Sequence, residues 1–444
     1  MNDHSVAAAY PSLRSARYAQ YLLAFVTLYT TMDVGVGKLL LEPMKVDLGM
    51  SDVEVGFANV TANYLTYGLL AIPAGLLADR YSRVRLMLLS LLLWTVGLIA
   101  VGAAPSFEAV VAGKLVLGAA MALSYPAIMS LFADYFAPDR RATATATIPI
   151  AQTVGAAMAV LIGGLGFSVL TEWVERDPDI LWGIAPWRAL LIGFAIGGLL
   201  LIPFLARLKE PQRMEAGEAQ GGKLRELWAY RRFLAPLIVG IMALSGVASG
   251  VTIWIAPALM RLYGQEPGDF ATWMSALALV TGLGGAYLSG QLAQRAHGRG
   301  VNMMAPAAIA AAIGTIGSFV AMMPDVLWFG IAMGIASLAN AVAIAIPVIA
   351  VNYRIPNELR GLTMGLYIVL LAIVGGVMAP LVAVASDYLG GEMMLGRAMA
   401  LVGVPFSLLA TLCFWKAARA PGGAAPDPAP AFDHNDMTNL TGKA

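Results

Sequence analysis

Charged residues are scarce in this sequence. Asp, Glu, Lys and Arg make up only 12% of its 444 residues, whereas hydrophobic residues make up 59%. Soluble proteins carry about 25% charged residues. The formal net charge of +1 leaves no strongly basic surface for nucleic acid. The composition therefore excludes an ordinary soluble domain, and we expect no nucleic-acid partner.

Cysteine and histidine are also nearly absent. The single cysteine is Cys413, and the three histidines are His4, His297 and His434. One cysteine cannot form an internal disulfide framework. Because no His, Cys or carboxylate cluster has metal-ligand spacing, we expect no metal and no cofactor. The G-x-x-x-x-G-K-[ST] run of a nucleotide-binding loop is missing as well. These absences predict that the chain is neither an enzyme nor driven by ATP.

Long hydrophobic blocks are the main feature that is present, and the mean hydropathy is +0.74. Each block is about 20–25 residues long, enough to cross the ~30 Å hydrocarbon core as a helix. We predict an all-α membrane protein with twelve transmembrane helices. The predicted spans are 19–41, 53–77, 84–104, 107–132, 142–168, 187–206, 233–258, 270–292, 302–323, 326–350, 362–385 and 397–416.

A polar connection, residues 207–232, separates the first six spans from the last six. About 21 of the 28 Lys and Arg lie on the N-terminal side of the predicted membrane, which the positive-inside rule assigns to the cytoplasm. Both termini are then cytoplasmic, and we expect a multi-pass protein of the bacterial inner membrane. The tail is rich in Pro, Ala and Gly and should be disordered. The predicted segments are an N-terminal segment (1–18), a six-helix bundle (19–206), a linker (207–232), a second six-helix bundle (233–418) and the tail (419–444).

A short sequence repeat occurs at the same place in each half. YFAPDRRATATA follows the fourth span and contains Arg141, whereas YRIPNELRGLTMG follows the tenth span and contains Arg360. A repeat of this kind indicates duplicated halves around a site near the membrane midplane.

The connection after the second span carries a family resemblance. AGLLADRYSRVRLM (74–87) resembles the G-x-L-x-D-R-x-x-R-[KR] signature of the major facilitator superfamily. The resemblance implies two pseudo-symmetric six-helix bundles that alternate between inward-open and outward-open states. It also implies a cytoplasmic gate, to which we assign Gly75, Asp79, Arg80, Arg83, Arg141 and Arg360.

Further segments resemble the Spinster-like branch of that superfamily. They are MD (32–33), LEPMKVDLGMSD (41–52), GLLADRYSRVRL (75–86), DYFAPDRRATA (134–144) and GGVMAPLVAVASDYLG (375–390). The resemblance implies a lipid-like substrate such as sphingosine phosphate or a lysolipid. Spinster-like proteins usually carry Arg after the first-span Asp, and an Arg and a Glu seven residues apart in the fourth span. Here those positions hold Val34, Lys114 and Met121.

Asp33 and Lys114 are charged residues inside otherwise apolar spans. A charge at the bilayer centre costs about 3 kcal/mol on insertion scales. Asp33 lies about 14 residues into the first span, ~21 Å from the cytoplasmic side, and Lys114 lies ~10 Å below the outer side of the fourth. These depths agree, and the superfamily resemblance implies that the first, fourth, seventh and tenth spans line a central cavity, so the two can face one another. We interpret them as a proton-coupled switch, the alternative being a fixed structural ion pair.

Lys38 differs from that pair. It lies five residues after Asp33, about 140° around the helix, and close to the outer interface. A long Lys side chain at that depth can extend to the headgroups. We therefore predict an interface anchor.

Polar and aromatic residues in the spans are candidates for the substrate cavity. Asn59, Asn63 and Tyr67 are spaced four apart, so they should share one helix face, where they either line the cavity or bond to another helix. The predicted cavity residues are Asn59, Asn63, Tyr64, Tyr67, Ser124, Gln152, Ser249, Trp254 and Asn340. Small-residue runs such as GAAMAVLIGG (155–164) are expected to serve close helix packing.

Few fixed charges in a mostly apolar cavity fit an amphiphilic, lipid-like or organic-anion substrate. The leading hypothesis is a monomeric secondary active transporter in the lipid bilayer, coupled to protons through Asp33 with Lys114. An alternative is a proton-coupled importer of organic or aromatic acids. A hypothesis of another class is a receptor or scaffold that kept the fold and lost transport.

Overall fold

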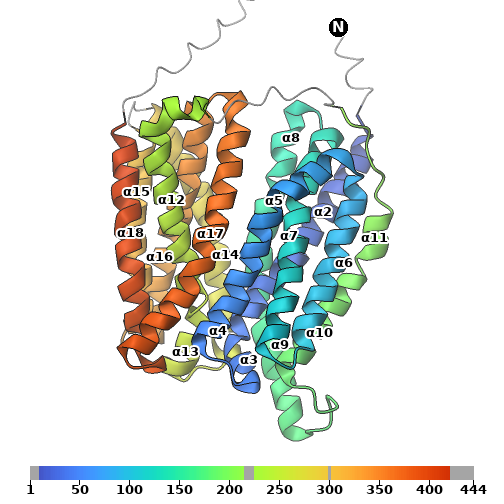
Figure 1. Ribbon diagram of the computed structural model, residues 1–444, viewed down its shortest axis with the longest axis vertical. Helices are drawn as coiled ribbons and strands as arrows, with labels where there is room; N and C mark the ends of the chain where they lie inside the picture. Colours follow the sequence, from blue (N-terminus) through green and yellow to red (C-terminus); the bar gives the residue numbers. More distant parts are fainter. Residues whose placement is uncertain (1–9, 215–224, 299–301, 421–444) are drawn as a thin grey trace, which may run out of the picture.

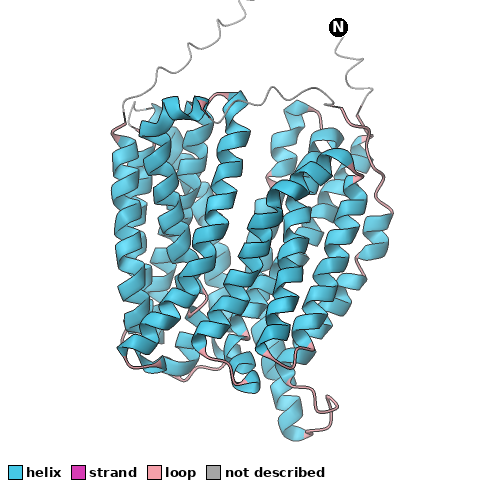
Figure 2. Ribbon diagram, in the orientation of Figure 1, coloured by secondary structure: helices cyan, strands magenta, loops and turns pink. Residues whose placement is uncertain are grey.

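The computed structural model describes residues 10–214, 225–298 and 302–420. Within these ranges the chain is helical and contains no β-strand (Figure 2). Most of the predicted tail, half of the N-terminal segment and the middle of the linker lie outside the described residues. The side chain of Arg360 lies outside them as well.

The first half of the chain supplies six long helical segments. Its elements are α2 (Leu13–Leu39), α3 (Leu41–Leu48), α4 (Asp52–Gly56), the π-helix η1 (Phe57–Ala62), α5 (Asn63–Arg80), α6 (Arg83–Gly102), α7 (Phe107–Tyr135), α8 (Pro138–Thr145), α9 (Thr147–Arg176), α10 (Pro186–Leu199) and α11 (Ile202–Ala206).

The second half repeats this arrangement. Its elements are η2 (Glu226–Tyr230), α12 (Arg231–Thr252), α13 (Ile255–Tyr263), α14 (Pro267–Gly298), α15 (Met304–Gly314), η3 (Thr315–Met322), α16 (Val326–Arg354), α17 (Asn357–Leu389), η4 (Glu392–Met394) and α18 (Leu395–Ala418).

Eleven helical segments in the described residues are long and apolar enough to cross a membrane. The remaining crossing is α17, whose 33 residues include side chains outside the described set. The predicted twelve-helix fold is therefore confirmed. The structure extends several predicted spans at their ends, because polar residues continue a helix beyond the apolar block.

The same helix break occurs in both halves, where the sequence repeat lies. α7 ends at Tyr135 and α8 begins at Pro138, while α16 ends at Arg354 and α17 follows Pro356. Proline suits the start of a helix because its fixed φ is already helical and its missing N–H is not needed there. Pro138 is the first residue of α8 and Pro356 is the N-cap of α17, so the repeated proline marks the start of a new helix in each half.

The two halves stand side by side and lean together at one end (Figure 1). We call the end where α2 begins and α18 ends the termini face, and the end that carries α3 and α13 the far face. The larger hydrophobic core runs through the first half and includes far-face residues of the second half, such as Trp254 and Leu395. A separate core, with Phe233 and Phe414, fills the termini-face end of the second half. The apolar interior is thus continuous between the halves at the far face.

Candidate functional site

Asp33 and Lys114 line one small cavity between α2 and α7, as their matching depths predict. Its volume is about 80 Å³, and each of the two residues is only 8% exposed. Asp33 lies about 9 Å along α2 from its far-face end, and Lys114 about 10 Å along α7 from its start. The two charges interact electrostatically but do not form a direct salt bridge. They are opposite charges held apart within one cavity.

Four predicted residues, Asn59, Asn63, Tyr64 and Ser249, complete the polar wall of this cavity. Asn63 Oδ1 is buried without a hydrogen-bond partner. Ser249 comes from α12, so the second half of the chain contributes to the site. We call this space the charged cavity. Its position where the two halves meet is suited to a group that senses their relative motion.

Lys38 also lines the charged cavity, so its prediction as an interface anchor is wrong. Its Nζ donates a hydrogen bond to Thr252 Oγ1 of α12 at 3.3 Å. The prediction assumed that only one face of the first helix turns inward. At its far-face end, α2 instead meets α7 on one side and the second half on another, so residues 140° apart both face protein.

A second cavity of about 270 Å³ lies inside the first half, between α2, α5, α6, α7 and α9. The predicted residues Tyr67, Ser124 and Gln152 line it. Val34 and Met121 line both this space and the charged cavity. The two cavities are therefore adjacent, and we call the larger one the inner cavity.

Sequence reasoning missed the contribution of α6 to the inner cavity. Met87, Ser90 and Trp94 line it, and the buried Trp94 indole lies beside the Asp33 carboxylate. Their spacing of three and four residues places them on one helix face. That spacing was a usable signal, but the surrounding residues are apolar throughout and conceal it.

Two predicted cavity residues lie elsewhere. Trp254 is fully buried in the core, where its indole N–H donates to the carbonyl oxygen of Ala379 at 3.2 Å. Asn340 lines a separate cavity of about 210 Å³ within the second half, against Gly314. Both predictions were wrong because residue type alone does not show which way a side chain points. Trp254 points to a carbonyl of another helix, and Asn340 points away from the central space.

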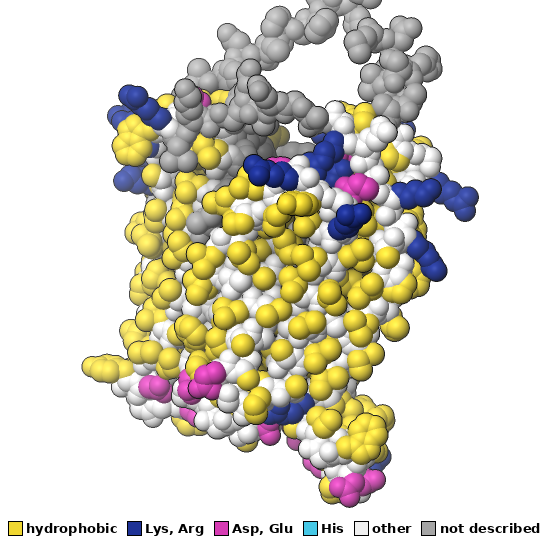
Figure 3. All heavy atoms as spheres, turned by 45° about the vertical axis from the view of Figure 1, so that its right-hand side comes forward, with side chains coloured by type: hydrophobic (Ala, Val, Ile, Leu, Met, Phe, Trp, Pro, Cys, Tyr) yellow, Lys and Arg dark blue, Asp and Glu magenta, His cyan; other side chains and the backbone are white. Residues whose placement is uncertain are grey.

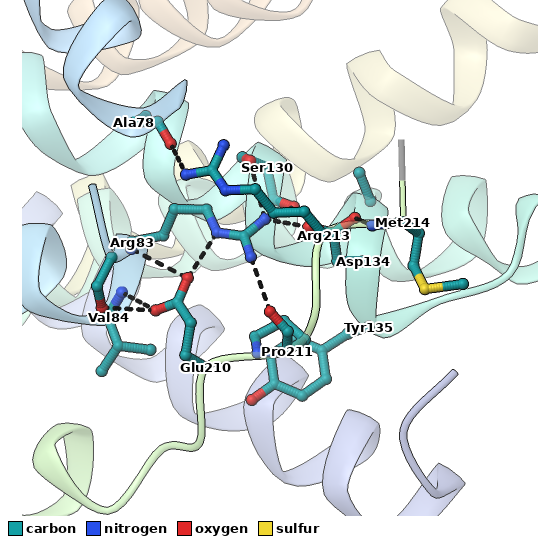
Figure 4. Close-up of polar contacts among 12 residues, drawn as sticks. Ala78, Arg83, Val84, Ser130, Asp134, Tyr135, Glu210, Pro211, Arg213 and Met214 are labelled. Atoms are coloured by element: carbon teal, nitrogen blue, oxygen red, sulfur yellow. Dashed lines mark hydrogen bonds and ion pairs between the residues drawn. The ribbon is translucent and has the colours of Figure 1, made fainter. Parts of the chain in front are cut away.

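Arg83 of the family signature is the centre of a buried polar cluster at the termini face (Figure 4). Its guanidinium pairs with Asp134 of α7 and with Glu210, whose Oε1 lies 2.7 Å from Nε, and also donates to the Pro211 carbonyl. Glu210 in turn accepts hydrogen bonds from the backbone N–H groups of Arg83 and Val84 at the start of α6. The cluster fastens the connection after α11 to α6 and α7.

The electrostatics of Glu210 follow from these contacts. Burial alone would raise the pKa of Glu210, but hydrogen bonds from Val84, Arg83 and Ser82 outweigh burial and hold the pKa below its usual value. A carboxylate at a helix N-terminus also complements the helix dipole. Glu210 therefore acts as an ionised cap for α6.

The other predicted gate residues whose side chains the structure describes lie outside this cluster. Asp79 and Arg80 are exposed at the end of α5, and Arg141 donates to the Ala133 carbonyl at 2.7 Å. A Cβ added at Gly75 would meet nothing within 4 Å, so no neighbouring helix packs closely on Gly75 in this conformation. The cause is that α5 and α17 diverge toward the termini face (Figure 1).

An ion-pair network that sequence reasoning missed joins the two halves at the far face. Arg261 of α13 binds Glu42 of α3 and Asp52 of α4, and Lys45 of α3 binds Asp52 and Glu392 of η4. Burial alone would lower the pKa of Lys45, but its hydrogen bonds to the two carboxylates outweigh burial and raise it. These residues hold the halves together where their hydrophobic core is continuous.

Several similar proteins are named as transporters or pumps. An MFS-type efflux pump of Mycolicibacterium smegmatis is 24% identical over 413 residues, which cover 91% of this chain and 93% of that protein. The 3-(3-hydroxy-phenyl)propionate transporter of Escherichia coli is 27% identical over 261 residues, 57% of this chain and 60% of that protein. Protein spinster of Drosophila melanogaster is 25% identical over 299 residues, 63% of this chain and 46% of that protein.

Solved structures agree on the fold. A bacterial homolog to the human lysosomal transporter Spinster, in an inward-facing and unoccupied conformation, matches with a TM-score of 0.78 at 20% identity. The match covers 92% of this chain and 98% of that one. This match and the similarity to Protein spinster confirm the predicted Spinster-like resemblance. The named relatives and the family match indicate a transporter, as predicted, and not an enzyme. The model of the Major Facilitator Superfamily matches residues 23–380, so the chain belongs to the Major Facilitator Superfamily.

Proposed function

We propose that this protein is a secondary active transporter that moves a small amphiphilic or organic-anion substrate across the bacterial inner membrane. The observation that carries the proposal is the burial of Asp33 and Lys114 in a cavity to which both halves of the chain contribute. Ionisable residues at membrane depth are costly and mark substrate or proton pathways. In a fold of two repeated halves, the substrate site is expected near the midplane.

Proton coupling is proposed to act through Asp33, with Lys114 as its partner. When Asp33 takes up a proton, the Lys114 ammonium loses the one negative charge that the described residues bring to the charged cavity. A buried charge left without its partner is strongly destabilising, typically by about 3–5 kcal/mol. An energy of that size is enough to shift an equilibrium between two conformations. Uptake or release of one proton is therefore expected to change which face is open.

The charge distribution supports cytoplasmic termini. On the face seen in Figure 3, Lys and Arg gather toward the termini face, and Asp and Glu toward the far face. The positive-inside rule would then place the termini face in the cytoplasm. The continuous core and the ion pairs of Arg261 and Lys45 at the far face support assigning this conformation as inward-facing.

A narrower function is import of organic or aromatic acids, and two relatives favour it. They are the 3-(3-hydroxy-phenyl)propionate transporter of Escherichia coli and a probable 4-methylmuconolactone transporter of Cupriavidus pinatubonensis. Both names describe small ring compounds. The protein is proposed to work as a monomer, since each half contributes to the site within one chain.

The test is substrate counterflow and proton-driven uptake in proteoliposomes that contain the purified full-length chain. Wild-type protein is expected to exchange a substrate and to accumulate it when a pH gradient is imposed. Asp33→Asn should keep exchange but lose the response to the gradient. A receptor or scaffold would exchange nothing. If Asp33→Asn and Lys114→Ala both leave pH-dependent uptake unchanged, the proposed coupling is wrong.

A further inference from the structure

The charged cavity holds more positive than negative charge. Among the described residues that line it, Lys38, Lys114 and Asp33 are charged and the rest are uncharged. Lys114 is 8% exposed and has no hydrogen-bond acceptor among the described residues, although an ammonium can donate three hydrogen bonds. Lys38 has a neutral hydroxyl partner, Thr252. One carboxylate shared by two cations leaves this cavity short of one negative charge.

The adjoining inner cavity supplies space for an apolar group. Its volume is about 270 Å³, whereas a dry cavity of about 150 Å³ is enough to bind benzene. Met87, Leu91, Trp94 and Tyr67 contribute apolar and aromatic wall. One aromatic ring with a short side chain fits this space. Since Val34 and Met121 border both cavities, one molecule can occupy the two at once.

We infer that the site binds an organic monoanion with a single compact apolar body, such as an arylalkanoate. This inference rests on the proposed transport function and names its substrate class. The anionic group binds between Lys38 and Lys114, and the ring lies in the inner cavity against Trp94. With a monoanion bound, two ammonium groups face two anionic groups. Carboxylates bound to ammonium groups form the stronger, charge-assisted kind of hydrogen bond.

Substrate binding at Lys38 would change a contact between the first and second halves of the chain. Its hydrogen bond to Thr252 joins α2 to α12. A bound carboxylate competes with the Thr252 hydroxyl for the same ammonium group. Binding therefore removes or weakens one contact between the halves, close to the place where they must separate.

The experiment measures binding of 3-phenylpropionate, 3-phenyl-1-propanol, 3-phenylpropylamine and a lysophospholipid to the purified full-length protein by calorimetry. The carboxylate should bind at least tenfold more tightly than the alcohol or the amine. Lys38→Met and Lys114→Met should each weaken carboxylate binding by about tenfold or more and leave alcohol binding unchanged. Lys416→Met, on the exposed last turn of α18, is the matched control and should change neither affinity. Melting curves without ligand verify that each variant is folded.

The inference is overturned if no phenylalkanoate from benzoate to 4-phenylbutanoate binds at millimolar concentration. It is also overturned if the amine or the lysophospholipid binds more tightly than the carboxylate. Its failure is distinct from failure of the proposed function. Counterflow of an amine or a lysolipid would keep the transporter and reject the anion site, whereas lysine-dependent carboxylate binding without counterflow would keep the site and reject transport.

Discussion

Arg261 of α13 and Asp52 of α4 form a two-point ion pair across the two halves of the molecule. The Nη1–Oδ2 distance is 2.6 Å and the Nη2–Oδ1 distance is 2.8 Å. Their side chains are only 7% and 2% exposed. Because the planar guanidinium matches the carboxylate at two points, this pair fixes orientation as well as distance. A buried pair with two contacts holds the far face closed more firmly than a single exposed pair would.

Replacing Arg261 with Gln should open the far face. Glu42 would then lose its cation and Asp52 would keep only Lys45, and breaking a buried pair typically costs about 3–5 kcal/mol. We expect the population open at the far face to rise by at least tenfold. The measurement is the rate at which a membrane-impermeant maleimide added at the far face labels Ser249→Cys in a Cys413→Ser background.

The matched control for this prediction is Arg176→Gln. Arg176 pairs with Glu172 one helical turn away, and both side chains are mostly exposed. Exposed pairs of this kind contribute about 0–1 kcal/mol. Labelling should therefore stay at the wild-type rate. Equal labelling in the Arg261 and Arg176 variants would show that the far-face network does not hold the halves together.

Arg83→Met should destabilise the first half strongly. The Arg83 side chain is 1% exposed, and its loss leaves Asp134 buried without its cation. The expected loss is about 3–5 kcal/mol in the free energy of unfolding, measured by denaturant titration in detergent. Arg85→Met is the control, because Arg85 is exposed two residues further along α6. If both variants lose the same stability, the buried cluster is not the cause.

Glu210 predicts a pH dependence of stability. Its folded pKa is below the unfolded value of about 4.3, so the ionised form adds stability at neutral pH. That contribution is lost as pH falls through the folded pKa. The melting temperature of Glu210→Gln should therefore lie below that of wild type at pH 7, and the difference should shrink below about pH 4. A difference that stays constant down to the lowest pH would contradict this assignment.

Single positions within apolar blocks could be predicted from the sequence because depth follows from helical rise alone. Asp33 and Lys114 were placed at matching depths by counting residues along two antiparallel spans, and the structure puts them in one cavity. The twelve spans followed from block length in the same way. Depth alone does not show which helices are neighbours, and the expectation that the first and fourth spans share a cavity came from the superfamily resemblance.

Contacts between residues far apart in the sequence could not be predicted in this way. Arg261 and Asp52 are 209 residues apart, and each reads in sequence as an ordinary loop charge near the end of a span. Lys38 was misplaced because its neighbours in space, and not its distance from Asp33, determine which way it faces. These contacts depend on how the two halves dock, which hydrophobic periodicity does not encode.

The small-residue run in α9 provides a last prediction, at the contact between the halves. A Cβ added at Gly164 would lie 2.5 Å from Ala271 Cβ and 2.7 Å from the Pro267 carbonyl oxygen, both on α14. The close packing predicted for this run is thus confirmed at Gly164. Overpacking such a contact typically costs about 1–3 kcal/mol, so Gly164→Ala should lower the free energy of unfolding by that amount.

Gly193 of α10 supplies the control for that contact, because an added Cβ would meet nothing within 4 Å. Gly→Ala at an unstrained site stabilises by about 0.4–1 kcal/mol, mainly by restricting the unfolded chain. Gly193→Ala should therefore raise stability and leave counterflow unchanged. Gly164→Ala should also slow counterflow, because α9 and α14 belong to different halves and must move past each other at this point. Unchanged counterflow in a destabilised Gly164→Ala protein would show that this contact moves as a rigid unit during transport.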